Sequence, residues 1–380
     1  MGQIGLALAQ LTDPPYGKHL PLDPNWNDNT TTNQLMKNKD FTGKNVVITG
    51  CTSGIGKEFG RVFYKHNANI LMVIRNDEKG TLVQKEWKKS YPKSMGKTHK
   101  FICDINELDQ VKVAVDELEK FIGKDKIDIL LLNALQYFEN PLKFNKDGQE
   151  IQFAGSLYTG HYMVCKLLPY MNENRGRIIQ TTSGASKMIQ SVYPHGPKFY
   201  DLNYEQEIGK NKIMSYLEQY KPYGLSKFAI NCAFYYYDIN IRKQKGKENI
   251  AFFPCAPGPT NTPGSKRLYT KIIPYLLIKV FGRIFLGIKI AKVEVGTANV
   301  VVGAIDDRFM TKKYRGKMMQ WKGVGKSHVK QYSKQICKKI VEHAEKVTGI
   351  KYPYTEKEET DNNITVKAIY PLLYADNDIK

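Results

Sequence analysis

The sequence lacks the residue patterns of several common protein classes. Its six cysteines stand far apart without a Cys-x-x-Cys pair, and its seven histidines do not cluster. Zinc sites and disulfide-rich secreted domains depend on closely spaced Cys and His residues. The spacing therefore argues against a metal centre and against a disulfide framework, and it favours a reducing compartment.

Secretory and membrane-spanning signals are also missing. No basic N-terminal region leads into an apolar stretch and a cleavage site. The most apolar stretch, residues 272–290, is interrupted by Lys279, Arg283, Lys289 and Pro274, whereas a spanning helix needs about 20 mostly apolar residues. We expect this stretch to lie at a lipid surface or over a substrate pocket, and the protein to be cytoplasmic or peripheral to an intracellular membrane, not secreted.

Acidic residues are scarce relative to basic ones. The chain has 57 Lys and Arg against 37 Asp and Glu, a formal net charge of +20, which favours anionic partners. The lysines are scattered instead of forming one dense arm, and no zinc-finger, RRM or KH signature accompanies them. We therefore expect a solvated basic surface and no nucleic-acid partner.

Short apolar runs alternate with amphipathic segments over most of the chain. The runs expected to form buried strands are residues 45–49, 69–74, 98–103, 127–132, 176–181 and 249–255. Residues 110–122 have apolar side chains at helical spacing and a glycine stop, and residues 326–347 predict a last helix. Such alternation predicts an α/β fold with a doubly wound parallel sheet covered on both faces.

The predicted organisation is a single domain with extensions. Residues 1–40 are rich in Pro, Asn and Asp and lack apolar periodicity, which predicts an irregular leader. Residues 41–347 form the predicted domain, including an insertion at 191–220 and the apolar segment 266–292. Residues 348–380 form a mostly polar tail beyond the C-terminal helical extension.

A glycine-rich turn follows the first predicted strand. The sequence Thr49-Gly50-x-x-x-Gly54-Ile55-Gly56 leads directly into a helical segment. Glycines allow the backbone to approach a pyrophosphate closely, and the helix N-terminus supplies amide donors and a positive dipole. The turn therefore predicts a dinucleotide site, and a turn without function is the alternative.

This spacing resembles the short-chain dehydrogenase/reductase family, whose other motifs follow in order. Asp104, the Leu132-Asn133-Ala134-Leu135 turn and the Pro257-Gly258-x-Thr260-x-Thr262 segment match cofactor-binding motifs of that family. The resemblance implies a Rossmann fold and these cofactor contacts: Thr49, Gly50, Thr52, Ser53, Gly54, Ile55, Gly56, Arg75, Asn76, Asp104, Ile105, Asn133, Ala134, Tyr223, Lys227, Pro257, Gly258, Thr260 and Thr262.

The second strand ends in Ile74-Arg75-Asn76. In the family, members that prefer NAD carry an acid at the position of Ile74, and Arg75 matches the basic residue that contacts the 2′-phosphate of NADP. An arginine binds phosphate bidentately. The resemblance therefore implies NADP(H) rather than NAD(H). The alternative interpretation is that Arg75 is a surface cation that does not contact the cofactor.

Three residues match the catalytic motifs of the family. Ser183 ends a strand, and Tyr223 and Lys227 form a Tyr-x-x-x-Lys motif forty residues later. Residues at i and i+4 share one face of a helix. A free tyrosine ionises at about 10, and a nearby ammonium stabilises the phenolate. The resemblance implies hydride transfer with Tyr223 as general acid, Ser183 holding the carbonyl oxygen and Lys227 also binding the nicotinamide ribose.

The sequence departs from the family in two places. The fourth catalytic residue of the family, an asparagine, is absent from residues 153–162; counting from upstream places Ser156 there, and one residue is inserted before Gly160. Leu135 replaces the last glycine of the Asn-Asn-Ala-Gly turn. His161 is interpreted as a packed helix residue, not a base. Two functions therefore remain as alternatives: an active oxidoreductase, and a catalytically impaired scaffold that binds nucleotides or a membrane surface.

The segment from Asp147 to Phe153, the insertion before Tyr223 and the apolar stretch after Thr262 resemble the retinol-dehydrogenase-like branch of the family. That resemblance implies a lipophilic small-molecule carbonyl or alcohol as substrate. Peripheral membrane contact and a homo-oligomer stay open.

Overall fold

A single parallel sheet organises the protein. The computed structural model describes residues 26–27, 29–135, 141–187, 216–265, 290–311, 314–320, 323–324 and 334–354. The strands are β1 Asn45–Thr49, β2 Asn69–Ile74, β3 Thr98–Ile102, β4 Ile129–Leu132, β5 Arg177–Thr181, β6 Ala251–Ala256, β7 Met319–Gln320 and β8 Gly323–Val324. Their order is β3-β2-β1-β4-β5-β6-β7-β8, and β8 alone runs antiparallel to its neighbour among these strands.

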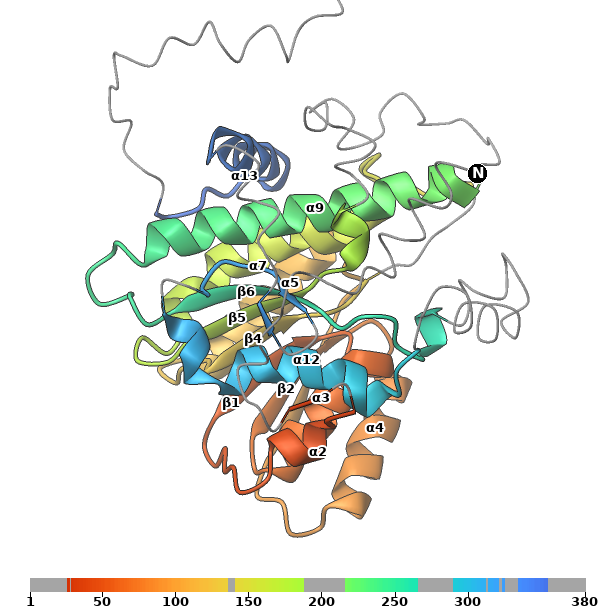
Figure 1. The fold of residues 1–380 in the computed structure, drawn as a ribbon, viewed down its shortest axis with the longest axis vertical. Coiled ribbons are helices and arrows are strands. Elements are labelled where there is room, and N and C mark those ends of the chain that lie inside the picture. The colour runs from red at the N-terminus through yellow and green to blue at the C-terminus, as the bar shows by residue number, and fades with distance from the viewer. Residues whose placement is uncertain are drawn as a thin grey trace, which may run out of the picture.

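Helices cover both faces of the sheet (Figure 1). One face carries α2 Thr32–Leu35, α3 Gly54–Lys65, α4 Asp77–Ser90 and α12 Val293–Ile305. The other carries α5 Leu108–Ile122, α7 Thr159–Leu167, α9 Tyr216–Ile241 and α13 Lys334–Thr348. Shorter helical turns are α6 Ile151–Phe153, η1 Ala154–Tyr158, η2 Leu168–Tyr170, η3 Gly184–Lys187 and η6 Asp307–Met310.

The chain order reverses between β1 and β4. Strands β1, β2 and β3 proceed towards one edge of the sheet, whereas β4, β5 and β6 proceed towards the other. Ligands of open parallel sheets bind at the carboxyl ends of the strands beside such a reversal. The fold therefore places a candidate site where β1, β4 and β5 end.

The doubly wound parallel sheet predicted from the sequence is confirmed. All six predicted strands are present, β1 and β2 with the predicted bounds and the other four with shifts of one or two residues at their ends. The leader is not irregular throughout: Thr31 caps helix α2, and the Thr32 hydroxyl donates to Glu58 of α3 at 2.5 Å. The two-residue strands β7 and β8 were not predicted. Residues 191–215, 266–289 and 355–380 lie outside the described residues.

A π-helical turn, η1, interrupts the helix that covers β4 and β5. It spans Ala154–Tyr158, where the sequence predicts one inserted residue. A π-turn accommodates an extra residue inside an α-helix and is frequent at functional sites.

Glu150 accepts hydrogen bonds from the backbone of Gln152 and Phe153 at the start of this segment, and burial raises its pKa to about 7.

Buried polar contacts attach the chain beyond α13 to the domain. His161 of α7 lies 2.9 Å from the Ile350 carbonyl through Nε2 and 2.6 Å from the Tyr237 hydroxyl through Nδ1. Because a carbonyl can only accept, Nε2 carries the proton and Nδ1 accepts from Tyr237. The Tyr352 hydroxyl donates to the Tyr237 carbonyl. His161 is therefore a neutral packing residue, as interpreted from the sequence.

We predict that this histidine makes the fold sensitive to acid. Burial lowers the pKa of His161 from 6.5 to about 4, so the unfolded chain binds a proton at a pH where the folded chain does not. The contribution of neutral His161 to the free energy of unfolding is complete above pH 6.5. It falls by about 1.4 kcal/mol per pH unit as the pH is lowered towards 4. Denaturant titrations at several pH values should show a shallower pH dependence in His161→Gln. Equal slopes in the two proteins would contradict the assignment.

Candidate active site

The glycine-rich turn joins β1 to α3. Gly50 and Gly54 have φ angles of +70° and +55°, a conformation that favours glycine. A Cβ on Gly56 would lie 2.5 Å from the Gly50 carbonyl oxygen, so the helix packs against the turn without room for a side chain. Ser53 occupies the N-cap of α3 without a side-chain capping bond. The first amides of α3 are therefore not capped by that side chain, and they suit an anionic group.

The other predicted residues of the turn differ in exposure. Ser53 is exposed and Thr52 half-buried, whereas Ile55 is buried in the core on the α3 side. The structure thus gives Ile55 a packing role in addition to its place in the turn.

Hydrogen bonds connect the carboxyl ends of β1, β4 and β5. The buried Thr49 hydroxyl oxygen accepts from the backbone amides of Asn133 and Ala134, at 2.8 and 2.9 Å. The Thr181 hydroxyl donates to the Asn133 side-chain oxygen at 3.2 Å. Asn133 is therefore hydrogen-bonded from both β1 and β5. These bonds fix the backbone conformation before Leu135, which replaces the last glycine of the Asn-Asn-Ala-Gly turn. Thr181 was not among the residues selected from the sequence.

The ends of β2 and β3 bring opposite charges together. Arg75 Nη1 lies 3.2 Å from Asp104 Oδ2. Asn76 caps α4 by accepting from the Lys79 amide at 2.8 Å, which is a structural role for a residue predicted to contact cofactor. The Ile105 carbonyl accepts from the Thr159 hydroxyl and thereby ties this loop to α7.

Tyr223 and Lys227 lie on one face of α9, as their spacing predicts. Lys227 Nζ is 5.7 Å from the centroid of the Tyr223 ring and donates to the Thr181 carbonyl at 2.9 Å. The lysine is 2% exposed, and no acidic side chain among the described residues forms an ion pair with it. Burial lowers its pKa from 10.5 to about 7. A buried amine without an ion-pair partner is costly for folding, which favours a functional role.

The two candidate serines have different surroundings. Ser183 is partly exposed at the end of β5, and its hydroxyl oxygen accepts from the Ala185 amide at 3.2 Å. Ser156 is buried in the π-turn, and its hydroxyl donates back to the Gln152 carbonyl. Its own carbonyl accepts from Gln180 Nε2 at 2.8 Å. The hydrogen bonds of Ser156 are thus made within the helix and to β5.

The loop after β6 closes against the glycine-rich turn. A Cβ on Gly54 would lie 3.3 Å from the Thr262 side chain, so these two segments are in contact. The Thr260 hydroxyl donates to the Gly258 carbonyl at 3.0 Å. Asn299 of α12, which the sequence did not single out, donates to the buried Pro257 carbonyl at 3.0 Å. The loop is thereby fixed beside the N-terminus of α3.

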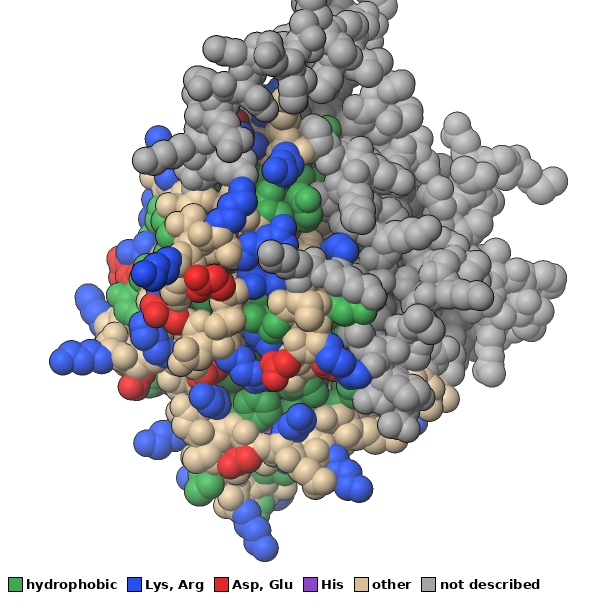
Figure 2. Space-filling model, turned by 60° about the vertical axis from the view of Figure 1, so that its left-hand side comes forward, with side chains coloured by type: hydrophobic (Ala, Val, Ile, Leu, Met, Phe, Trp, Pro, Cys, Tyr) green, Lys and Arg blue, Asp and Glu red, His purple; other side chains and the backbone are tan. Residues whose placement is uncertain are grey.

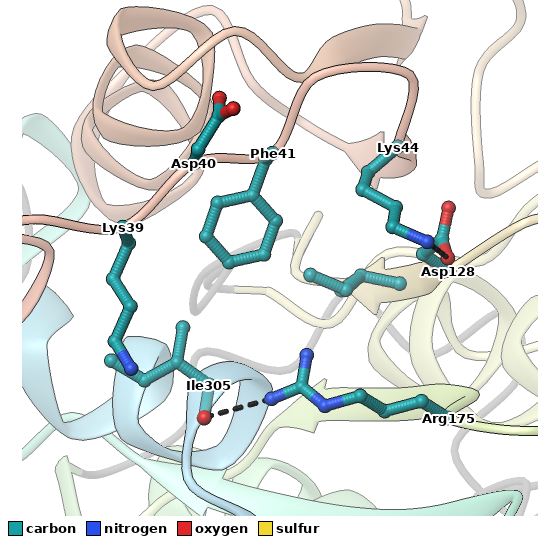
Figure 3. Close-up of a pocket in the computed structure, with 8 residues that line it drawn as sticks. Lys39, Asp40, Phe41, Lys44, Asp128, Arg175 and Ile305 are labelled. Carbon is teal, nitrogen blue, oxygen red and sulfur yellow. Dashed lines mark hydrogen bonds and ion pairs between the residues drawn. The ribbon is translucent and has the colours of Figure 1, made fainter.

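A separate pocket lies at the amino-terminal ends of the strands, opposite the candidate active site (Figure 3). Lys44 forms an ion pair with Asp128 at 3.2 Å, and Arg175 donates to the Ile305 carbonyl at the end of α12. Arg175 and the buried Arg177 both contact Asp307. These charges neutralise one another and the negative end of α12, which accounts for them structurally.

Two general features bear on partners. On the face shown in Figure 2, Lys and Arg side chains are scattered among acidic and polar groups. No helix in the described ranges is long and apolar enough to cross a membrane.

The sheet order, the glycine-rich turn and the carboxyl-end site define a Rossmann-type α/β protein. Residues 44–195 match the family model described as short chain dehydrogenase. The chain is 31% identical over 148 residues to the human WW domain-containing oxidoreductase, covering 38% of this chain and 33% of that protein. It is 27% identical over 237 residues to a short-chain dehydrogenase/reductase of Armillaria gallica, covering 60% and 69%. Over this part of its length the chain is similar to short-chain dehydrogenases.

Solved structures support the same fold at low sequence identity. The L-sorbose reductase of Gluconobacter frateurii, solved with NADPH and L-sorbose, aligns with a TM-score of 0.54 and 19% identity over 76% of this chain and 98% of that one. The angucycline C-6 ketoreductase LanV with bound NADP gives a TM-score of 0.52 and 18% identity over 73% and 94%. The match to the human relative spans about a third of that relative's length.

We predict that Lys227 weakens the fold that carries it. Its pKa is lowered to about 7 in the folded protein, so the unfolded chain holds the proton more strongly between pH 7 and 10.5 and stability rises with pH across that window. Lys227→Met should stabilise the cofactor-free protein at pH 7 by roughly 1–3 kcal/mol, and the gain should shrink towards pH 10. Lys124→Met, at an exposed lysine, is the control. A destabilised Lys227→Met protein at pH 7 would show that the amine supports the fold.

Proposed function

We propose that the protein is an NADP(H)-dependent oxidoreductase that interconverts a carbonyl compound and an alcohol. The observation that carries the proposal is the buried Lys227 amine, which lies beside the Tyr223 ring and has no acidic partner among the described residues. A buried amine without an ion-pair partner is costly for folding, whereas its charge favours the phenolate of a neighbouring tyrosine during proton transfer.

The residues at the carboxyl edge fit a dinucleotide. Gly50 and Gly54 have positive φ angles, the α3 N-terminus has no side-chain cap, and Thr262 packs against Gly54, so backbone amides without a capping side chain are available at this end of the sheet. Such amides suit a pyrophosphate. In this proposal the turn from Gly50 to Gly56 holds the phosphates, Asn133 and Ala134 border the adenosine ribose, and the Pro257–Thr262 loop borders the nicotinamide.

The bound cofactor would supply or accept the hydride. Tyr223 would donate a proton to the carbonyl oxygen during reduction, and Ser183 would hold that oxygen through its hydroxyl. The Lys227 ammonium would stabilise the phenolate that Tyr223 leaves behind. The Thr181 carbonyl, which accepts from Lys227 at 2.9 Å, keeps the ammonium on the tyrosine side of β5.

A catalytically impaired scaffold is the second candidate. It is favoured by Ser156, which replaces the expected asparagine and whose hydroxyl and carbonyl are both bonded elsewhere. We prefer the enzyme because Ser183, Tyr223 and Lys227 are all present and Asn133 is fixed in the absence of the last turn glycine.

The finer assignments are also proposals. Segment 147–153 resembles the retinol-dehydrogenase-like branch, and segments 262–264 and 319–322 resemble dehydrogenase/reductase SDR family member 12. We propose a lipophilic substrate by analogy with that branch. A location in the cytoplasm or at the periphery of an intracellular membrane is a separate proposal, and a homo-oligomer stays open. Ser156 as a fourth catalytic group is retained only as part of this analogy.

We predict that Tyr223→Phe removes most of the reductase activity. The variant keeps the ring beside Lys227 but loses the hydroxyl proton, and general acid catalysis contributes about 10²- to 10⁴-fold. NADPH oxidation with a panel of lipophilic aldehydes and ketones measures the effect, with NADPH affinity by fluorescence as the control for cofactor binding. Equal turnover in both proteins would exclude Tyr223 as the acid, and retained NADPH binding without turnover in the wild type would favour the impaired scaffold.

We predict that Arg75→Ala weakens NADPH binding by roughly ten- to a hundredfold and NADH binding much less, since charge-assisted bonds to a phosphate are among the strongest polar contacts. Titration of both nucleotides measures the two affinities. Lys124→Met, far from the strand ends, serves as the control for a lost positive charge. Equal losses for NADPH and NADH would show that Arg75 does not contact the 2′-phosphate.

A further inference from the structure

The cation proposed to select NADP(H) already has an acidic partner within the protein. Arg75 follows β2, and Asp104 lies just beyond β3, which pairs with β2 in parallel. Arg75 Nη1 is 3.2 Å from Asp104 Oδ2. Because parallel neighbours end at the same edge of the sheet, the two side chains meet where an adenosine ribose would lie.

The carboxylate is the fixed member of this pair. Asp104 Oδ1 accepts from the backbone amide and from the side-chain amide of Asn106, at 3.0 and 2.9 Å. The Asp104 backbone amide donates to the Gln110 side chain. The Asp104 side chain is 25% exposed, against 65% for that of Arg75. The arginine can therefore turn towards a ligand, whereas the carboxylate stays in place.

Other acidic groups near Arg75 are engaged elsewhere or exposed. Asp77, in the first turn of α4, forms an ion pair with Lys100 at 2.6 Å. Glu78, next to it, is exposed. Asp104 is the acidic side chain in direct contact with Arg75 among the described residues. Its charge is thus the one that a phosphate bound to Arg75 would meet first.

We propose that Asp104 is a specificity-determining residue that limits the preference for the 2′-phosphorylated cofactor. This inference rests on the proposed function. A 2′-phosphate must take the Arg75 guanidinium from a carboxylate and then remain within a few ångströms of it. Two like charges at that separation repel each other even in water. NADH carries no 2′-phosphate and does not meet this repulsion.

The decisive variant is Asp104→Asn. The substitution keeps an oxygen for the two Asn106 bonds and removes the charge that faces Arg75. We expect the ratio of NADPH to NADH affinity to rise roughly three- to tenfold above that of the wild type, because any loss of a shared cofactor contact affects both nucleotides alike. The gain should shrink as salt is raised, because exposed charges are screened. Fluorescence titrations of both nucleotides at low and high ionic strength measure these changes.

Asp109→Asn is the matched control, since Asp109 is an exposed acid at the start of α5 that pairs with Lys146 instead of Arg75. It should leave the ratio of NADPH to NADH affinity unchanged. An unchanged or lowered ratio in Asp104→Asn, with both nucleotides bound by the wild type, would overturn the role of Asp104 and leave the proposed function intact. Failure of the wild type to bind either nucleotide would overturn both.

Discussion

The proposed chemistry depends on one interaction, the hydrogen bond from the buried Lys227 ammonium to the Thr181 carbonyl. Burial disfavours the charged amine, and the pKa of Lys227 is lowered to about 7 as a result. The carbonyl offers a partner without neutralising the charge. A carboxylate there would stabilise the fold further, but it would cancel the field at Tyr223. The protein thus keeps a reactive amine at a cost in stability, as expected where function and folding compete.

Thr181 connects this interaction to the reversal of strand order. Its carbonyl holds the lysine of α9, while its hydroxyl holds Asn133 at the end of β4. Thr49 at the end of β1 holds the backbone on the other side of Asn133. A short polar chain therefore runs from the glycine-rich turn to the tyrosine and lysine. Because each member is buried or half-buried, a shift in one strand end would be transmitted to the others.

The sequence was sufficient for the fold and for the order of its motifs, since six apolar runs and a glycine-rich turn carry strong local signals. It did not predict β7 and β8, because two residues leave no periodicity to detect. Thr181 and Asn299 were missed because their roles come from contacts between distant segments. The one-residue insertion near Ser156 was visible, but its outcome as a π-turn depends on how the helix packs on β5 through Gln180.

The same limit explains why Asp104 was predicted from the sequence only as a cofactor contact. From the sequence, Arg75 and Asp104 are separate motif positions, each matched to its own part of a cofactor. The parallel register of β2 and β3 brings them into contact, so neither can be assigned a binding role independently of the other. In the proposal, cofactor choice is a property of the pair: the arginine would attract a 2′-phosphate and the fixed carboxylate would resist it, so that the difference would set the preference.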